Sequence, residues 1–198
     1  LFPQLKSSTM TKFCQQAEAH LQDVPVWSDE LYLELHRGCY TSHADQKRYN
    51  RRCEHWLVEA EMFSAIATLL TQAPYPKAEL ETAWKKVLFN QFHDILPGSS
   101  IPEVFADANR EWELAQQSAL ALRENALRAI TSQIHLPEPA VMNAIPLVVY
   151  NSLNWERSET ISWKIPGDIS LNGQVLDEAG HLLPTQIDKQ SRTLRFWS

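Results

Sequence analysis

The chain has 198 residues, of which 44% are hydrophobic, so it is long enough to bury an apolar core in one large domain or two small ones. Its 24 acidic residues outnumber its 18 basic residues, which argues against nucleic acid or an anionic membrane surface as a partner. No apolar run reaches the length that a bilayer requires, and no signal segment opens the chain.

The ends and the cysteines of the chain suggest its context. Cys14, Cys39 and Cys53 are odd in number and form no CxxC pair, which favours reduced thiols and a cytoplasmic location. The chain begins at Leu1 without a methionine and stops in "LRFWS", which is typical of a strand. We therefore expect a piece of a longer protein.

Residues 1–42 have a mixed pattern. A short helix is predicted around "STMTKFCQQAEAHL", with Ser8 or Thr9 as its cap. Hydrophobic residues then alternate with polar ones from Leu31 to Leu35, which favours a strand.

Residues 43–135 carry a strong helical signal. Apolar residues recur in steps of three and four from Tyr49 to Leu70 and again from Ile101 to Ala126, and Ser42 and Ser100 are predicted to open capping boxes. Between these stripes lies a second helix that starts near Pro76 and ends close to residues 94–95, before Pro97. Its predicted core residues are Leu80, Trp84, Val87 and Leu88. Three helices with short connections predict an antiparallel bundle.

Residues 136–198 change in character. Pro137 and Pro139 suggest a linker, after which "LVVYNSLNWERSETISWKI", "LLPTQID" and "RTLRFW" are rich in strand-forming residues and "DEAGH" is typical of a turn. The predicted fold class is α+β, in which the three-helix bundle is followed by the incomplete start of an antiparallel β-sandwich.

The doublet His93–Asp94 is the first candidate for chemistry. Imidazole is a good ligand for divalent metals, and a carboxylate can bind either a metal or sugar hydroxyls. Adjacent helical residues point about 100° apart, so the two side chains cannot both face one core. A carboxylate at the C-terminal end of a helix also opposes the helix dipole, so Asp94 occupies a position that a purely structural choice would avoid. The competing interpretation is an ordinary helix end with a turn.

Two further segments carry charge. In "ELHRGCYTS", His36 and Arg37 could line a pocket, or they could belong to a salt-bridged loop. The basic run "QKRYNRR" at 46–52 is interpreted as the solvated face of a helix rather than as a nucleic-acid site. The sequence contains no glycine-rich phosphate loop, GxSxG elbow or HExxH motif.

Together, "ELYLELHRGCYTSHADQKRYNRRCE" and "NQFHDILPGSSI" resemble the central segment of class II α-mannosidases, glycoside hydrolase family 38. The later "VVYNSLNWER" and "DEAGHLLPTQI" resemble the opening of that family's C-terminal β domain, so the resemblance runs from about Val24 to the end. The form of the motifs is closest to the bacterial and cytosolic branch.

The resemblance implies an enzyme in three parts: a catalytic α/β barrel, a three-helix bundle and a large β domain. The barrel, which supplies the nucleophile, the general acid and most metal ligands, is expected to be absent here, and residues 1–42 would hold its tail and an entry loop. On the positions of this chain, His93 matches the last zinc ligand and Asp94 the residue that holds mannose hydroxyls. His36 and Arg37 fall where the family lines its sugar pocket, and no catalytic residue is expected within the chain.

The function implied by the resemblance is a share in a retaining, metal-dependent α-mannosidase that hydrolyses terminal α-D-mannosides. One divalent ion, zinc in the first instance, is the expected cofactor. The expected partners are an α-mannoside or oligosaccharide, the barrel of the same protein and a second copy in a homo-oligomer. Alone, the chain is expected to be inactive and to bind zinc only weakly, because one imidazole does not make a closed site.

Two other classes stay open from the residues alone. A metal-dependent phosphohydrolase of the HD type would use the doublet together with His43, His55 and Asp107. A helical interaction module with a β appendage would use the exposed apolar surface of the chain as its binding face.

Overall fold

The structure is a computed structural model that describes residues 3–30, 35–136, 141 and 144–198, and it divides the chain into two units, Leu1–Gly38 and Cys39–Ser198. The first unit contains α1 (Met10–His20), whose N-terminus is capped by Thr9, because the Thr9 hydroxyl accepts a hydrogen bond of 3.3 Å from the Lys12 amide. The predicted helix and its cap are thus confirmed. All but the last residue of the predicted strand at 31–35 lie outside the described residues. A short 3-10 helix, η1 (Arg37–Tyr40), leads into the second unit.

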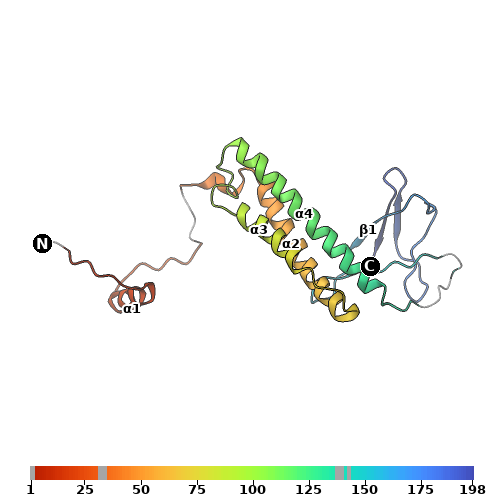
Figure 1. Ribbon diagram of the computed structural model, residues 1–198, viewed down its shortest axis with the longest axis horizontal. Coiled ribbons are helices and arrows are strands. Elements are labelled where there is room, and N and C mark those ends of the chain that lie inside the picture. The colour runs from red at the N-terminus through yellow and green to blue at the C-terminus, as the bar shows by residue number, and fades with distance from the viewer. Residues whose placement is uncertain (1–2, 31–34, 137–140, 142–143) are drawn as a thin grey trace. The chain divides into compact units, whose positions relative to one another are not determined.

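Three long helices, α2 (Ala44–Thr71), α3 (Lys77–Asn90) and α4 (Pro102–Thr131), form the predicted bundle and lie side by side in Figure 1. Alanines on α2 and α4 are fully buried and let the two helices approach closely. The main core consists of Cys53, Leu57, Ala60, Leu80, Ala83, Val87, Ile95, Ala108, Trp112, Ala115 and Ala119. All three cysteines are free thiols, and burial next to Glu54 raises the pKa of Cys53 to about 11.

The ends of the helices differ from the sequence prediction. The N-cap residues are His43 for α2 and Ile101 for α4, and neither predicted capping box forms, since neither helix has a side-chain cap. Helix α3 ends at Asn90, earlier than predicted, because residues 91–98 form turns instead. Leu88, predicted to belong to the core, is 59% exposed, because the buried face of α3 holds Val87 instead.

The C-terminal part of the chain forms a small antiparallel sheet from β1 (Thr160–Lys164), β2 (Thr185–Asp188) and β3 (Thr193–Trp197). The strand order is β1-β3-β2, so β3 is central. These strands confirm the α+β fold class, and the predicted turn at "DEAGH" is confirmed by Gly180, which has a φ of 86° and donates its amide to the Asp177 carbonyl. Within the predicted strand-like segment 147–165, β1 forms, but residues 147–159 are irregular.

The segment after α4 contacts the bundle through Tyr150 and Ser152. The Tyr150 ring meets Phe63 edge to face at 5.7 Å, and its hydroxyl lies 2.8 Å from Thr131 Oγ1. Ser152 donates to Glu59 Oε1 at 2.9 Å. A second apolar cluster forms here at the ends of α2 and α4.

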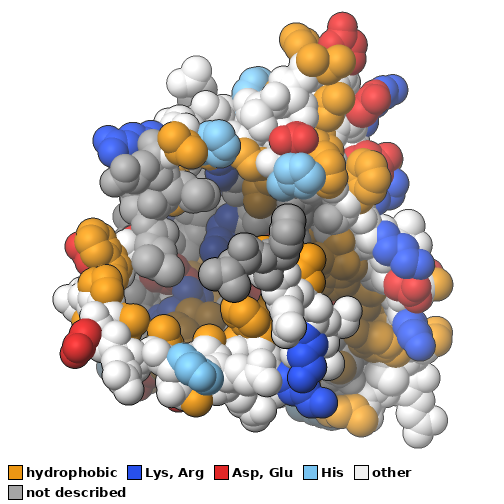
Figure 2. Space-filling model, turned by 90° about the vertical axis from the view of Figure 1, so that its left-hand side faces the viewer, with side chains coloured by type: hydrophobic (Ala, Val, Ile, Leu, Met, Phe, Trp, Pro, Cys, Tyr) orange, Lys and Arg blue, Asp and Glu red, His pale blue; other side chains and the backbone are white. Residues whose placement is uncertain are grey.

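The surface carries charges of both signs. On the face drawn in Figure 2, Lys and Arg side chains are interspersed with Asp and Glu side chains and with hydrophobic ones. In the described part of the chain, no helix combines the length and the apolarity needed to cross a membrane.

Candidate functional site

The doublet His93–Asp94 lies in the turn that follows α3, outside the helix proper. Both side chains are accessible, with 78% of the His93 side chain and 54% of the Asp94 side chain exposed. They lean toward each other, since His93 Nε2 is 3.5 Å from Asp94 Oδ2. The His93 ring also contacts the Phe92 ring, at a centroid distance of 4.2 Å. An imidazole nitrogen and a carboxylate therefore converge on the same patch of solvent.

This pair fits a metal ion only as a partial site. Among the residues that the structure describes, no three His, Cys, Asp or Glu side chains lie close enough to hold an ion together. An exposed imidazole next to a carboxylate can supply one ligand and a hydrogen-bond acceptor, whereas a closed zinc site needs about four ligands. Any further ligands would have to come from outside the described residues.

The other two predicted site residues belong to the first unit. His36 is exposed, and Arg37 is exposed and opens η1. His93 and Asp94 belong to the second unit, which is described separately. Of the four predicted site residues, the structure therefore places only His93 and Asp94 next to each other.

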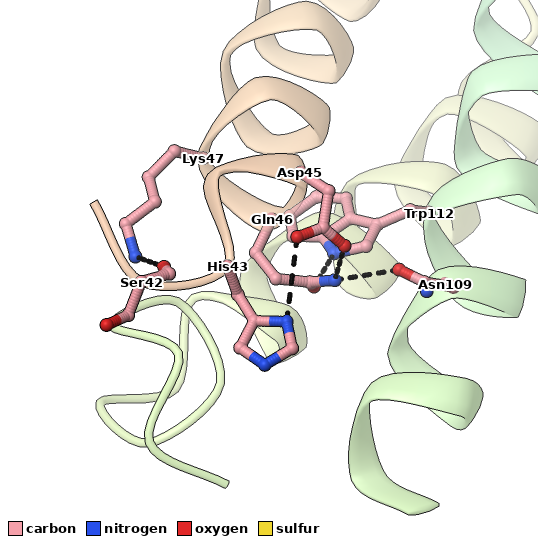
Figure 3. A network of polar contacts seen from close by, with 7 residues as sticks. All are labelled: Ser42, His43, Asp45, Gln46, Lys47, Asn109 and Trp112. Atoms are coloured by element: carbon pink, nitrogen blue, oxygen red, sulfur yellow. Dashed lines mark hydrogen bonds and ion pairs between the residues drawn. The ribbon is translucent and has the colours of Figure 1, made fainter. Parts of the chain in front are cut away.

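A polar network that the sequence analysis did not predict joins α2 to α4 (Figure 3). The buried Gln46 side chain accepts from Trp112 Nε1 at 2.8 Å and donates to Asn109 Oδ1 at 2.7 Å and to Asp45 Oδ2 at 2.9 Å. Interpreting all of 46–52 as a solvated face is therefore wrong at Gln46, which is 0% exposed. It holds for Arg48, Arg51 and Arg52, which are exposed. The burial of Gln46 could have been predicted from its position, because it lies seven residues, or about two helical turns, before Cys53 and on the same buried face of α2.

His43 and Asp45, separated by one residue at the start of α2, form a second histidine–carboxylate pair that was not predicted from the sequence. His43 Nδ1 is 3.6 Å from Asp45 Oδ1, and the His43 ring stacks on Phe105 at 3.8 Å. With Ser100 and Asn109, this ring borders an open hollow of about 350 Å³. The surroundings of His43 are thus an aromatic contact and one nearby carboxylate.

The set of residues needed by an HD-type phosphohydrolase does not assemble. His55 is exposed on α2, and Asp107 is paired with Arg110 on α4. Neither joins the doublet or His43 in a group of three metal-binding side chains within the described chain.

The comparisons with known proteins agree on one family. Residues 34–130 match the model "Alpha mannosidase middle domain". The chain is 33% identical over 166 residues to Alpha-mannosidase 2C1 of Homo sapiens, which covers 83% of this chain and 15% of that protein. It is 43% identical over 105 residues to Alpha-mannosidase G of Dictyostelium discoideum, covering 53% of this chain and 10% of that protein.

A solved structure shares the fold. A glycosyl hydrolase family 38 protein from Enterococcus faecalis superposes with a TM-score of 0.63 at 21% identity, over 96% of this chain and 25% of that one. The chain thus spans a small part of the length of the relatives it matches. It belongs to the class II α-mannosidases of glycoside hydrolase family 38 and carries their middle domain.

Proposed function

We propose that this chain is the part of a larger retaining, metal-dependent α-mannosidase that supplies one metal ligand, His93, and one mannose-binding carboxylate, Asp94. The observation that carries the proposal is the convergence of these two exposed side chains, Nε2 to Oδ2 at 3.5 Å, in the turn after α3 of an α-mannosidase middle domain. Family membership supports the substrate class, because the relatives are named as α-mannosidases.

The chemistry of the doublet suits two neighbouring tasks. A neutral imidazole is a ligand for zinc and similar ions, and an ionised carboxylate accepts hydrogen bonds from sugar hydroxyls. Because the two groups face the same patch of solvent, an ion at His93 and a hydroxyl at Asp94 would be neighbours. Adjacent positions in the chain therefore hold the ion and the sugar side by side.

A single divalent ion, zinc in the first instance, would supply Lewis-acid stabilisation to hydroxyls of the bound sugar. His93 would hold this ion with one nitrogen, and its other ligands would come from elsewhere in the protein. His36 and Arg37 would add polar contacts to the sugar, with the Arg37 guanidinium donating to hydroxyl oxygens.

The hydrolytic steps need groups that this chain does not supply. A retaining glycosidase uses two carboxyl groups about 5 Å apart, one as nucleophile and one as acid and then base. Asp94 is instead assigned to substrate binding. On its own, the chain is therefore expected to leave α-mannosides unhydrolysed.

The test uses the complete protein that contains this chain. His93→Ala is expected to lower the affinity for zinc, because one ligand of the set is lost. Asp94→Asn is expected to keep the ion but to lower kcat/KM for an aryl α-mannoside about 10- to 100-fold, because a charged hydrogen bond to the sugar is weakened. Chelator competition and steady-state kinetics measure the two effects.

His55→Ala and Asp107→Asn are matched controls, since both side chains are exposed on the helices of the same bundle. Both should leave zinc affinity and kinetics unchanged. Zinc binding by His93→Ala that equals that of the unchanged protein would contradict the proposed role of His93.

A further inference from the structure

We propose that Gly98 and Ser100 are positioning residues that fix the turn carrying His93 and Asp94 in its metal- and sugar-binding geometry. This inference rests on the proposed function. It assigns a role to residues that touch neither the ion nor the sugar but lock the backbone that presents the two binding side chains.

The turn is first anchored on the side of α3. Gln91, its first residue, donates from Nε2 to Asn50 Oδ1 at 2.9 Å and to Glu54 Oε1 at 3.1 Å, both on α2. Ile95 is only 5% exposed and belongs to the core of the bundle. His93 and Asp94 lie between these two anchors, so only their side chains are free to project outward.

Gly98 fixes the other end of the turn by close contact. Its φ is +84°, a conformation that glycine adopts without strain and that other residues rarely take. A Cβ atom built at this position would lie 2.6 Å from the Ser42 carbonyl oxygen and 3.0 Å from the His43 Cβ atom. The backbone of the turn therefore packs directly on the segment that enters α2, and any side chain at residue 98 would push the two apart.

The segment on the opposite side of this contact is itself held in place. The Ser42 carbonyl accepts a hydrogen bond from Lys47 Nζ, as Figure 3 shows. His43 has a φ of 46° and stacks on the buried Phe105. The hydrogen bond to the Ser42 carbonyl and the stacking of His43 both resist displacement of this segment. A side chain at residue 98 is therefore expected to displace the turn rather than the segment.

Ser100 forms a hydrogen bond with the backbone of Asp94 itself. Its Oγ donates to the Asp94 carbonyl oxygen at 2.6 Å, and Ser99 Oγ lies 3.5 Å from Asp94 Oδ1. The hydroxyl that the sequence suggested as a cap for α4 is thus used to hold the backbone of a binding residue. Loss of this bond would free the Asp94 peptide while leaving the helices intact.

The experiment compares Gly98→Ala and Ser100→Ala in the complete protein. Chelator competition gives the zinc dissociation constant, and kcat and KM are measured for an aryl α-mannoside. Each variant is expected to raise the zinc dissociation constant about 10-fold or more, as loss of the groups that orient a metal ligand commonly does, and to lower kcat. Circular dichroism confirms that each variant is folded at the temperature of the assay.

The controls separate positioning from general damage. Gly173→Ala introduces the same methyl group at a glycine with open space around it and should bind zinc normally. Ser100→Thr keeps the hydroxyl and should restore most of the affinity that Ser100→Ala loses. If Gly98→Ala does not fold, the comparison of Ser100→Ala with Ser100→Thr decides the question.

The outcomes distinguish this inference from the function on which it rests. If His93→Ala weakens zinc binding but Gly98→Ala and Ser100→Ala do not, the positioning role is overturned and the proposed function stands. If His93→Ala binds zinc normally, the proposed function and the positioning role both fail.

Discussion

Both the oxygen and the nitrogen of the Gln46 side-chain amide form hydrogen bonds inside the helical bundle. Its oxygen accepts from the indole of Trp112, and its nitrogen donates to Asn109 and Asp45. Gln46 and Trp112 are both fully buried, so neither can replace its partner with water. The network thus fixes the register between α2 and α4 close to the start of α2.

Gln46→Ala is expected to lower the free energy of unfolding by about 1–3 kcal/mol, because the Trp112 N–H and the Asn109 carbonyl lose their buried partner. Urea denaturation of the chain measures the difference. Gln117→Ala, at an exposed glutamine of α4, is the matched control and should change stability by less than about 0.5 kcal/mol. Equal effects of the two substitutions would show that the network adds no stability.

Single residues mark the limit of prediction from the sequence. The break at Pro97 and Gly98 and the composition of the doublet were sufficient to select His93 and Asp94 as candidates, and the structure exposes both. The partner of Ser100 could not be predicted, because a serine before a helix is an equally good cap, and only the folded turn brings the Asp94 carbonyl within 2.6 Å. The burial of Gln46 was missed because a glutamine within a basic run is usually solvated.

At the scale of elements, α2 and α4 are matched by small residues. Ala115 and Ala119 on α4 are fully buried, as is Ala60 on α2, and they leave room for the large ring of Trp112. Alternation of small and large side chains lets two helices pack at short range along most of their length.

Ala115→Leu is expected to destabilise the bundle by about 1–3 kcal/mol, because the added atoms have no space between the helices. Thermal and urea unfolding followed by circular dichroism report the change. Ala121→Leu places the same side chain on an exposed position of α4 and should be close to neutral. A neutral Ala115→Leu would mean that the helices can separate at this position without cost.

The helices themselves were predictable, because their apolar stripes repeat over many turns, and α2, α3 and α4 fall where the periodicity put them. Their ends were not. Periodicity counted Leu88 inward, yet the structure exposes it, since helix α4 and the rest of the core cover the face that holds Val87 instead. The strand prediction for 147–165 failed only before β1, where Tyr150 and Ser152 contact the bundle rather than a neighbouring strand.

For the molecule as a whole, Glu59 is one of the bundle residues that contact the C-terminal part, beside Phe63 and Thr131. Its two carboxylate oxygens accept from Arg123 Nη1 at 2.6 Å and from Ser152 Oγ at 2.9 Å. The side chains of Glu59 and Arg123 are 27% and 30% exposed, so the pair is only partly screened by solvent.

Glu59→Ala is expected to cost about 1–2 kcal/mol and to increase hydrogen exchange in the segment around Ser152, because that segment loses its tie to α2. Hydrogen-exchange mass spectrometry and urea denaturation measure the two effects. Glu124→Ala removes the carboxylate of the exposed pair with Arg128 and serves as the control, with less than about 1 kcal/mol expected. Unchanged exchange around Ser152 in Glu59→Ala would contradict a joining role for this carboxylate.

The candidate site could also be predicted only in part from the sequence. A resemblance in "NQFHDILPGSS" pointed to His93 and Asp94, and the family comparison supports the protein class. The pairing of these residues with a full set of metal ligands could not be read from the chain, because such sets assemble from segments that are distant in sequence. Composition and periodicity describe each segment in isolation, whereas a closed site depends on their arrangement in space.

The central place of β3 in the sheet has a consequence for synthesis of the chain. Strands β1 and β2 each pair with β3 and not with each other, although β3 is the last of the three to be translated. The ribosome must therefore release residues 193–197 before either earlier strand finds its hydrogen-bonding partner. The helices can assemble before that moment, so during this interval β1 and β2 leave their edges unpaired beside a folded bundle, and such edges promote aggregation.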